Sequence, residues 1–533
     1  MKDNLDISEK GWFTDLWSKV CKVIEKTIDI VKSIPNNLYL INHDILDLFT
    51  KLNEKYGGGE KMNPVPFVYR FGSKCVLVTK PEHIVQVFTG KEFDRSAPKN
   101  FLDKFRELLG FSLITVDPHY HKEVRMRTLD FLTGRSLQNF GNIMINVIDQ
   151  IYLPKWKESA KNGNVIDITK DMFYYSSEVS FCGILDIPIN IVPNEVHQAL
   201  NRVFSHVRSN LLRIIPLPNI YYKIMGDKFK EDKELIQRFI RPYIDKNREL
   251  DNPIGWTIRY HTKRQSLNLN RLGEYVNDDY LVEKVVEMYN QNADIFDISK
   301  KIARELHNNI GTSMEQLQVD IAAILCDGGI IDEKNVLDEL TSNLIGGSET
   351  TILMMAWGLY RLSLYPNIQE ELYDNIMKIN TTDKILKQEE VWNCKYLQNT
   401  LSEILRLDSP AYIFPRSTIE DVHIGNLHVP KGTVIWGSQY ITQRSLYVWD
   451  NPLEFNPKRW DSKPKDGTFF TFTIGSRMCP GNRYAYLEAG LAISTLVRYF
   501  KISLDPTCPT NIGHDLGVTY RPNKPIKILL QLR

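Results

Sequence analysis

A glycine-framed cysteine loop constrains this chain more than any other stretch. Cys479 stands between glycines at −4 and +2, Gly475 and Gly481, with an arginine at −2, Arg477, and a phenylalanine at −7, Phe472. Glycine permits positive φ and a close approach of the backbone. The pattern therefore predicts a segment that folds tightly around one sulfur atom.

A helix is predicted directly after this loop. The run from Arg483 to Val497 has the composition of a mostly buried helix. Cys479 would then sit just before a helix N-terminus, where the dipole and the unpaired N–H groups favour thiolate over thiol. The plain alternative is a core cysteine in a glycine-rich turn.

The whole pattern, Phe-x-x-Gly-x-Arg-x-Cys-x-Gly, resembles the heme-binding signature of the cytochrome P450 family. This resemblance implies that the Cys479 thiolate is the axial ligand of the iron of heme b (iron protoporphyrin IX), a ligand that favours O–O cleavage. It also implies that Arg477 pairs with a heme propionate, because an arginine fork suits a carboxylate. Phe472 would pack near the sulfur.

A long helix is predicted over residues 332–365, with a length of about 50 Å. Near its middle stand Gly346 and Gly347, each of which costs about 1 kcal/mol in a helix interior. This cost suggests a bulge, a close ligand approach or an accidental kink. The segment resembles the oxygen-activating signature of the family, which implies that Thr350 hydrogen-bonds dioxygen, directly or through water, and that Glu349 relays protons.

A third pattern joins two distant segments. Glu403 and Arg406 would share one helix face, which alone is a commonplace surface pair worth a few tenths of a kcal/mol. Arg459 follows in Asn-Pro-Lys-Arg-Trp. The set resembles the Glu-x-x-Arg pair of the family and the arginine of its Pro-Glu-Arg-Phe motif. The resemblance implies a buried structural triad of Glu403, Arg406 and Arg459 that braces the Cys479 loop.

Three further residues match positions that hold the heme propionates in the family. His121 and Arg125 stand one helical turn apart on one face, and Arg416 lies at the start of a predicted strand. Gln443 stands where the family usually has a histidine. The donor there is neutral, which weakens a propionate contact.

Composition excludes other classes of protein. Sixty-six Lys and Arg residues against 65 Asp and Glu residues leave no polyelectrolyte signal, so nucleic acid is not an implied partner. The seven cysteines are irregularly spaced without a C-x-x-C pair, which indicates neither a disulfide framework nor a zinc site. A hydrophobic content of 43% is enough for a large core.

The chain divides into an N-terminal segment, residues 1–60, and a catalytic domain, residues 61–533, with a polar insertion at about 251–312. The insertion is expected to be a solvated loop or a docking surface. Residues 11–32 form an amphipathic pattern that would pack against the protein or lie on a membrane surface. With neither a transmembrane span nor a signal peptide expected, we expect a protein on the cytoplasmic side, soluble or peripherally membrane-associated.

The signatures occur in the order of the family and imply its fold, a mainly α, triangular heme-thiolate domain with a long central helix and a small β region. They imply a monooxygenase that inserts one oxygen atom from O2 into a hydrophobic organic substrate such as a lipid or sterol. No flavin or nicotinamide domain is visible, so a separate reductase or ferredoxin would supply the electrons. One alternative is a peroxide-using heme-thiolate peroxygenase or isomerase, which the Glu349–Thr350 pair argues against. The other is a non-catalytic heme-dependent binding or sensor protein.

Overall fold

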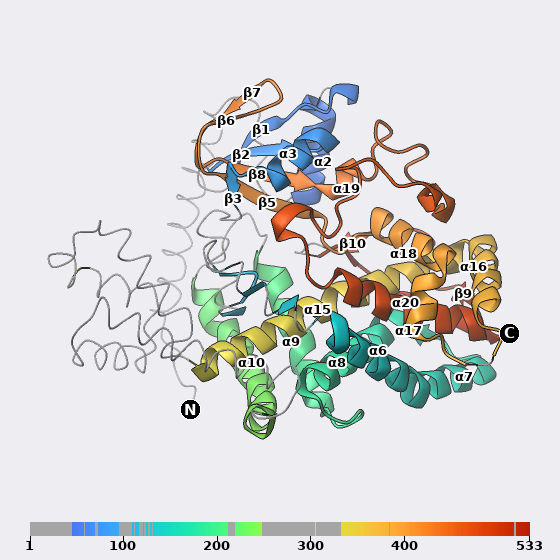
Figure 1. Cartoon of the computed structure of the whole chain (residues 1–533). Helices are drawn as coiled ribbons and strands as arrows, with labels where there is room; N and C mark the ends of the chain where they lie inside the picture. Colours follow the sequence, from blue (N-terminus) through green and yellow to red (C-terminus); the bar gives the residue numbers. More distant parts are fainter. Residues whose placement is uncertain are drawn as a thin grey trace, which may run out of the picture.

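Helices form most of the body of this protein in a computed structural model. The main sheet lies at one side of this body, and a smaller three-stranded sheet lies among the helices (Figure 1). The expected amphipathic helix over residues 11–32 lies outside the described residues, and so does the expected insertion at about 251–312, except for residue 304. The structure describes residues 45–57, 59–69, 73–94, 109–110, 112–116, 121, 124–125, 128–129, 132–211, 219–247, 304, 332–382, 384–515 and 519–533.

The elements follow one another in chain order with helices and strands interleaved. The helices are α2 (Ile45–Tyr56), α3 (Pro81–Thr89), α6 (Gly134–Val147), α7 (Leu153–Asn162), α8 (Ile168–Leu185), α9 (Asn194–Leu211), α10 (Asn219–Asn247), α15 (Asp332–Leu364), α16 (Pro366–Ile379), α17 (Gln388–Asn393), α18 (Lys395–Leu407), α19 (Gln439–Thr442) and α20 (Asn482–Tyr499), with short helical turns η1 (Gly59–Lys61), η2 (Ile148–Tyr152), η3 (Pro457–Asp461) and η4 (Gly475–Arg477). The strands are β1 (Val65–Tyr69), β2 (Ser73–Val78), β3 (Phe93–Asp94), β4 (Ile166–Asp167), β5 (Ile413–Thr418), β6 (Val422–Ile424), β7 (Leu427–Val429), β8 (Val434–Ser438), β9 (Phe500–Leu504), β10 (His514–Asp515), β11 (Arg521–Pro522) and β12 (Lys527–Leu532).

The predicted long helix is confirmed as α15, which begins at Asp332 and ends at Leu364. It crosses the helical body (Figure 1) and packs against α8, α18 and α20. Residues 351–360 are all buried. A helix that is buried all round belongs to the interior of a large domain, so α15 forms the centre of the helical body. Pro188 and Pro193 predict a break in the helices near 187–193, and it is confirmed because α8 ends at Leu185 and α9 begins at Asn194.

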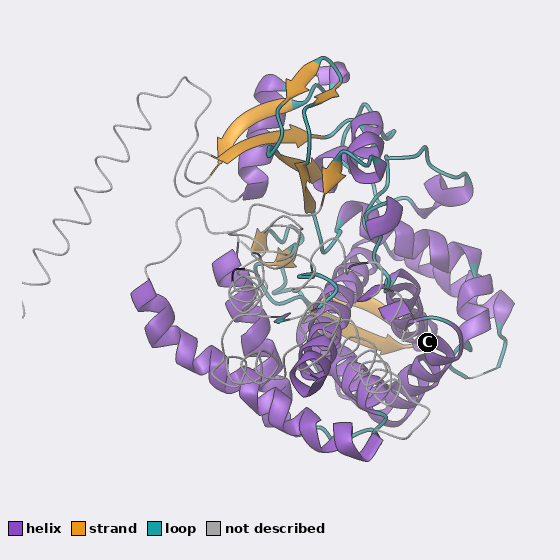
Figure 2. Ribbon diagram, turned by 60° about the vertical axis from the view of Figure 1, so that its left-hand side comes forward, coloured by secondary structure: helices purple, strands orange, loops and turns teal. Residues whose placement is uncertain are grey.

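The β region is built on a five-stranded sheet in the order β1-β2-β8-β5-β3. The sequence predicts a hairpin centred on Gly72 and Ser73 and a helix that opens at Pro81. Both are confirmed, with Val65 of β1 opposite Leu77 of β2 and α3 beginning at Pro81. The parallel pairing of β2 with β8 joins segments from both ends of the chain. Figure 2 shows this sheet as a separate layer beside the helices. Its strand β5 carries Arg416 toward the site described below.

The interior is one large apolar cluster, with a second cluster between the main sheet and α3. The largest fully buried side chains include Trp156 and Trp357, but also the charged Arg406. A fully buried arginine is rare unless it is paired, and its partners are described below. Among the described helices, none has the length and apolar character needed to cross a membrane. The predicted mainly α architecture with a small β region is confirmed.

Candidate functional site

The Cys479 loop is a tight turn closed by its own backbone. The N–H of Cys479 donates to the carbonyl of Phe472 at 2.8 Å. Within the loop, the hydroxyl of Thr473 donates to the carbonyl of Arg477 at 3.0 Å. Helix α20 begins at Asn482. The predicted position of the cysteine just before a helix N-terminus is therefore confirmed.

Gly475 fixes where this loop sits on the rest of the protein. Its φ is +77°, and a Cβ at this position would lie 2.6 Å from the carbonyl oxygen of Phe88 at the end of α3. Only glycine meets both conditions without strain. Cys479 is partly buried and belongs to no disulfide. The turn thus holds one cysteine sulfur at a fixed place beside α3.

Two arginines meet at this loop. Arg125 donates through Nη1 to the carbonyl of Met478, and Nη2 of Arg477 lies 3.8 Å from Oδ1 of Asp94. Burial lowers the pKa of Arg477, the carboxylate of Asp94 raises it, and the neighbouring charge of Arg125 lowers it. Two cations that repel each other, with one loosely placed carboxylate, favour the binding of a further anion between them.

Arg416 approaches the same region from strand β5. Its guanidinium carbon lies 4.4 Å from the centre of the Phe88 ring, and Nη1 donates to the carbonyl of Pro415 at 2.8 Å. The Arg416 side chain is 4% exposed. Phe88 therefore connects two predicted site residues, because its ring contacts Arg416 and its carbonyl abuts Gly475.

The other predicted contacts of the cofactor are partly or fully buried. His121 is 4% exposed, one helical turn before Arg125. Phe472 packs against Tyr486 of α20, with ring centres 5.8 Å apart. The structure thus brings Arg125, Arg477 and Phe472 to the Cys479 loop and places His121 in the interior nearby in sequence.

Helix α15 offers open space at its two glycines. A Cβ on Gly346 or Gly347 would meet no atom of the described chain within 4 Å. The hydroxyl of Thr350, one turn later, donates to the carbonyl of Gly346 at 3.0 Å. The helix is an uninterrupted α-helix here, so the bulge considered from the sequence is wrong. The open space favours a close ligand approach instead.

The side chain of Glu349 contacts a different neighbour from that of Thr350. Its side chain is 8% exposed, and its Oε1 accepts a hydrogen bond from the hydroxyl of Thr519 at 3.3 Å. Thr519 lies just before β11, far along the chain. Nothing in the sequence pairs these two residues, because the contact depends on how the C-terminal strands fold back onto α15.

Glu403, Arg406 and Arg459 form one buried cluster. Arg406 donates to both carboxylate oxygens of Glu403, at 2.8 and 2.9 Å, and Nε of Arg459 donates to Oε1 of Glu403 at 2.9 Å. Trp460 adds an indole N–H bond to Oε2 at 2.9 Å. Glu403 and Arg406 are 0% exposed. Burial lowers the pKa of Arg406, whereas the hydrogen bond and the charge of Glu403 raise it.

Gln443 links this cluster to the segment before the cysteine loop. Its amide N–H donates to the carbonyl of Arg406 at 3.0 Å, and its amide oxygen accepts from the N–H of Phe470 at 3.2 Å. Its side chain is 0% exposed. In the sequence, Gln443 is notable only as a departure from the histidine of the family. Its bridging role has no signal in the sequence, because it depends on three distant segments that meet there.

A heme fits the chemistry of these residues. The group carries two propionates and needs an axial ligand, and the described chain supplies two adjacent arginines and a cysteine within one turn. The open space at Gly346 and Gly347 provides room on the central helix. Within the described residues no group of histidine, cysteine or carboxylate side chains could hold a metal ion by itself. A single cysteine sulfur beside two arginines matches a heme-thiolate centre.

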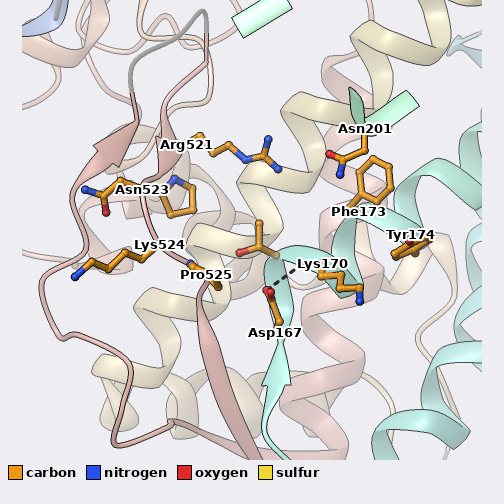
Figure 3. A pocket seen from close by; sticks show the side chains of 11 residues that line it. Asp167, Lys170, Phe173, Tyr174, Asn201, Arg521, Asn523, Lys524 and Pro525 are labelled. Atoms are coloured by element: carbon orange, nitrogen blue, oxygen red, sulfur yellow. Dashed lines mark hydrogen bonds between the residues drawn. The ribbon is translucent and has the colours of Figure 1, made fainter. Parts of the chain in front are cut away.

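A separate cavity of about 310 Å3 opens where the start of α8 meets residues 521–525 (Figure 3). Arg521 points toward Asn201, whereas Lys524 points away from it. Asp167 caps α8 by accepting from the N–H of Lys170 at 3.1 Å. None of the predicted site residues lines this cavity, and its lysine and arginine side chains do not point toward one another. The cavity is therefore not part of the candidate site.

Comparisons with known proteins agree with this site. The profile of the family Cytochrome P450 matches residues 32–264 and 263–530. Pentalenene oxygenase of Streptomyces avermitilis is 23% identical over 449 residues, 83% of this chain and 85% of that protein. Beta-amyrin 11-oxidase of Glycyrrhiza uralensis is 22% identical over 453 residues, 82% of this chain and 77% of that protein. A cytokinin hydroxylase of Arabidopsis thaliana is 30% identical over 201 residues, 37% and 38% of the two chains.

The fold has a match among solved structures. The crystal structure of the cytochrome P450DA heme domain superposes with a TM-score of 0.71 over 94% of this chain and 96% of that one, at 16% identity. At this identity the likeness shows the shared fold. Because the family profile also matches nearly the whole length, the chain belongs to the cytochrome P450 family and is an oxidoreductase of the oxygenase class.

Proposed function

We propose that this protein is a heme-thiolate monooxygenase that inserts one atom of O2 into a hydrophobic organic molecule such as a lipid or sterol. The observation that carries the proposal is the meeting of Arg125 and Arg477 on the turn that holds Cys479. The similarity to an oxygenase, an oxidase and a hydroxylase supports the reaction class.

Heme, when bound, supplies the oxygen chemistry, in which one oxygen atom enters the substrate, the other leaves as water, and two electrons and two protons are consumed. Cys479 would bind the heme iron through its sulfur, and the N-terminus of α20 favours the thiolate form that this requires. Arg125 and Arg477 hold the propionates, with His121 and Arg416 as further donors.

Thr350 and Glu349 of α15 hold and transfer protons in the proposed reaction. The Thr350 hydroxyl donates to the carbonyl of Gly346, beside the open space at that glycine, and can turn to hold a water or dioxygen there. Glu349 is buried beside Thr519 and can pass a proton inward from the C-terminal segment. A positioned hydroxyl and an acid one residue apart suit general acid catalysis at one site.

A separate reductase or ferredoxin supplies the electrons. The face around Cys479 offers a place for it, because Met478 is 37% exposed in the same loop. Close by, a cavity of about 450 Å3 is lined by Ile474 of the loop and by two lysines and one carboxylate, Lys463, Lys465 and Asp466. Lysines there favour an acidic partner through charge complementarity.

Replacing the Thr350 hydroxyl tests the proposal. In the variant Thr350→Ala, with a competent reductase and a turned-over substrate, electrons should still be consumed, but they should appear mainly as hydrogen peroxide instead of product. The reason is that proton delivery to the oxygen loses its fixed hydroxyl. The measurement is the ratio of product formed to reducing equivalents consumed.

Thr351→Ala is the matched control. Thr351 makes the same bond to its own helix, donating to the carbonyl of Gly347 at 2.9 Å, but its side chain is 1% exposed and packed in the interior. This control should keep its coupling ratio. Full coupling in Thr350→Ala, or turnover of the native protein with peroxide alone, would refute the role proposed for α15.

A further inference from the structure

A layer of buried polar side chains lies inside the helical body, and it contains the carboxyl group of Glu488. Glu488 stands on α20, nine residues after Cys479, and is 0% exposed. Two hydroxyl groups of the described chain act on its carboxyl, Ser176 and Tyr484, and no cation does. The proposed reaction uses none of these residues.

The groups that face Glu488 come from its own helix and from α8. Tyr484 lies one turn earlier on α20, and Tyr175 and Ser176 lie on α8, all 4% exposed or less. Tyr152 of η2 lies beyond Tyr175, with ring centres 5.6 Å apart. Asp171 and Glu178 of α8 act on Tyr152. These two carboxyls have basic partners of their own, because Nζ of Lys155 lies 2.6 Å from Asp171 and Nε2 of His197 lies 3.1 Å from Glu178. The groups that act on Glu488 itself are hydroxyls.

The polar layer continues to the central helix. The hydroxyl of Ser348 on α15 donates to the hydroxyl of Ser180 on α8 at 2.9 Å. The Ser180 hydroxyl lies close enough to the Tyr484 hydroxyl to lower its pKa, although the two form no well-formed hydrogen bond. Ser348 stands directly between Gly347 and Glu349 in the chain. Buried hydroxyls thus connect the segment that carries Thr350 with the helix that follows Cys479.

An ionised carboxylate is expensive at such a place. Taking a charge out of water without a cationic partner disfavours the charged form. Burial raises the pKa of Glu488 to about 8, although the nearby hydroxyls of Ser176 and Tyr484 act in the opposite direction. The carboxyl oxygens and the hydroxyls of Tyr175, Ser176 and Tyr484 are buried with no well-formed hydrogen bond in the structure, so a protonated acid, which can donate as well as accept, suits the cluster.

We propose that Glu488 is a positioning residue that holds a proton at neutral pH and, through Tyr484, Ser180 and Ser348, joins the helix behind Cys479 to the segment of α15 around Thr350. The roles of Cys479 and Thr350 in catalysis, and therefore the functional effect of this junction, rest on the function proposed above. When Glu488 ionises, an unpaired charge enters the layer between α8, α15 and α20 and weakens the junction. Alkaline pH then disturbs the Cys479 loop and the Thr350 segment together.

The sign of the pH dependence follows from the direction of the shift. The carboxyl binds its proton more tightly in the folded protein than in the unfolded chain, where its pKa is about 4.3. The stability that this proton provides is complete below the unfolded pKa. It is lost as the pH rises toward the folded pKa of about 8.

The proton can be observed directly in the full-length, heme-loaded protein. Infrared difference spectra recorded during an alkaline titration should show loss of the carbonyl stretch of a buried protonated carboxyl, with a midpoint near pH 8. Glu488→Gln should lack this band. Glu389→Gln is the control, because it removes an exposed carboxylate from α17, and it should keep the band.

The junction is tested by following the Soret band of the reduced carbon monoxide complex in the same titration. The thiolate-type band should decline with the same midpoint in the native protein and in Glu389→Gln, and should persist in Glu488→Gln. Should Glu488→Gln fail to fold, Tyr484→Phe serves instead. It removes a hydroxyl that lowers the pKa of Glu488, so both midpoints should move to higher pH.

The outcomes separate this proposal from the general function. A native protein without the carboxyl band, or a midpoint that Glu488→Gln and Tyr484→Phe leave unchanged, overturns the role of Glu488. A native protein that binds heme but gives no thiolate-type band at any pH overturns the proposed function. In that case the infrared band still decides whether Glu488 is protonated.

Discussion

At the scale of single residues, charge around the Cys479 loop decides what the site can hold. Arg125 and Arg477 lie close enough to affect each other, and Asp94 is only a distant partner of Arg477. The repulsion between these two cations costs energy, and an anion that binds between them relieves it. A dianionic cofactor is therefore held partly by relief of this repulsion.

Arg477→Ala should weaken heme binding by about tenfold to a hundredfold, the range expected for one charge-assisted hydrogen bond. Arg483→Ala is the control, because Arg483 is exposed and lies just after the loop, over the Trp392 ring. Titration of the heme-depleted proteins with heme measures both affinities. Equal affinities in the two variants would contradict a propionate contact of Arg477.

Gly475 is a second residue with a specific task. Gly475→Ala introduces both a strained φ, which costs about 1–2 kcal/mol, and a contact of 2.6 Å with the Phe88 carbonyl. Gly432→Ala introduces a similar φ, +79°, but its Cβ meets nothing within 4 Å. Chemical denaturation should show a larger loss in Gly475→Ala. If the free energy of unfolding falls by the same amount in both variants, the close approach of Gly475 to α3 does not contribute to stability.

At the scale of elements, the cluster of Glu403, Arg406 and Arg459 joins α18 to η3. The Nη1 atom of Arg406 also donates to the carbonyls of Gln443 and Pro452, each at 2.7 Å. The arginine thus binds backbone carbonyls of the irregular segment between α19 and η3. We interpret the cluster as the brace of the chain that leads to the Cys479 loop.

Glu403→Ala should destabilise the protein by about 3–5 kcal/mol, because it leaves the buried charge of Arg406 unpaired. The Lys395–Asp461 pair nearby, at 3.6 Å, has side chains that are 69% and 61% exposed. Lys395→Ala should therefore change stability little. Denaturation and heme content report the two effects. Wild-type stability with an altered substrate range in Glu403→Ala would instead assign this residue to the pocket.

At the scale of the whole molecule, the parts predicted from sequence are those that depend on neighbours along the chain. The hairpin at Val65, the helix at Pro81, the long α15 and the turn around Cys479 each carry their signal within one segment. Local spacing was misleading at Gly346 and Gly347, where the structure has a regular helix beside open space instead of a bulge.

The parts that could not be predicted depend on distant segments. Gln443 bridges α18 and Phe470, Glu349 accepts a bond from Thr519, and Glu488 is buried by α8. None of these contacts produces a periodic pattern in the sequence, because tertiary packing determines which residues meet. Resemblance to a family supplied the roles of Glu403 and Arg459, whereas spacing alone indicated only a surface pair.

The central claim is that the sulfur of Cys479 ligates heme iron, and the absorption spectrum of the reduced protein with carbon monoxide tests it most directly. The native protein should show the strongly red-shifted Soret band that a thiolate ligand produces. Cys479→His should bind heme but lose that shift, because imidazole donates less electron density than thiolate. A folded native protein without the shifted band, or a Cys479→His variant that retains it, would contradict the account.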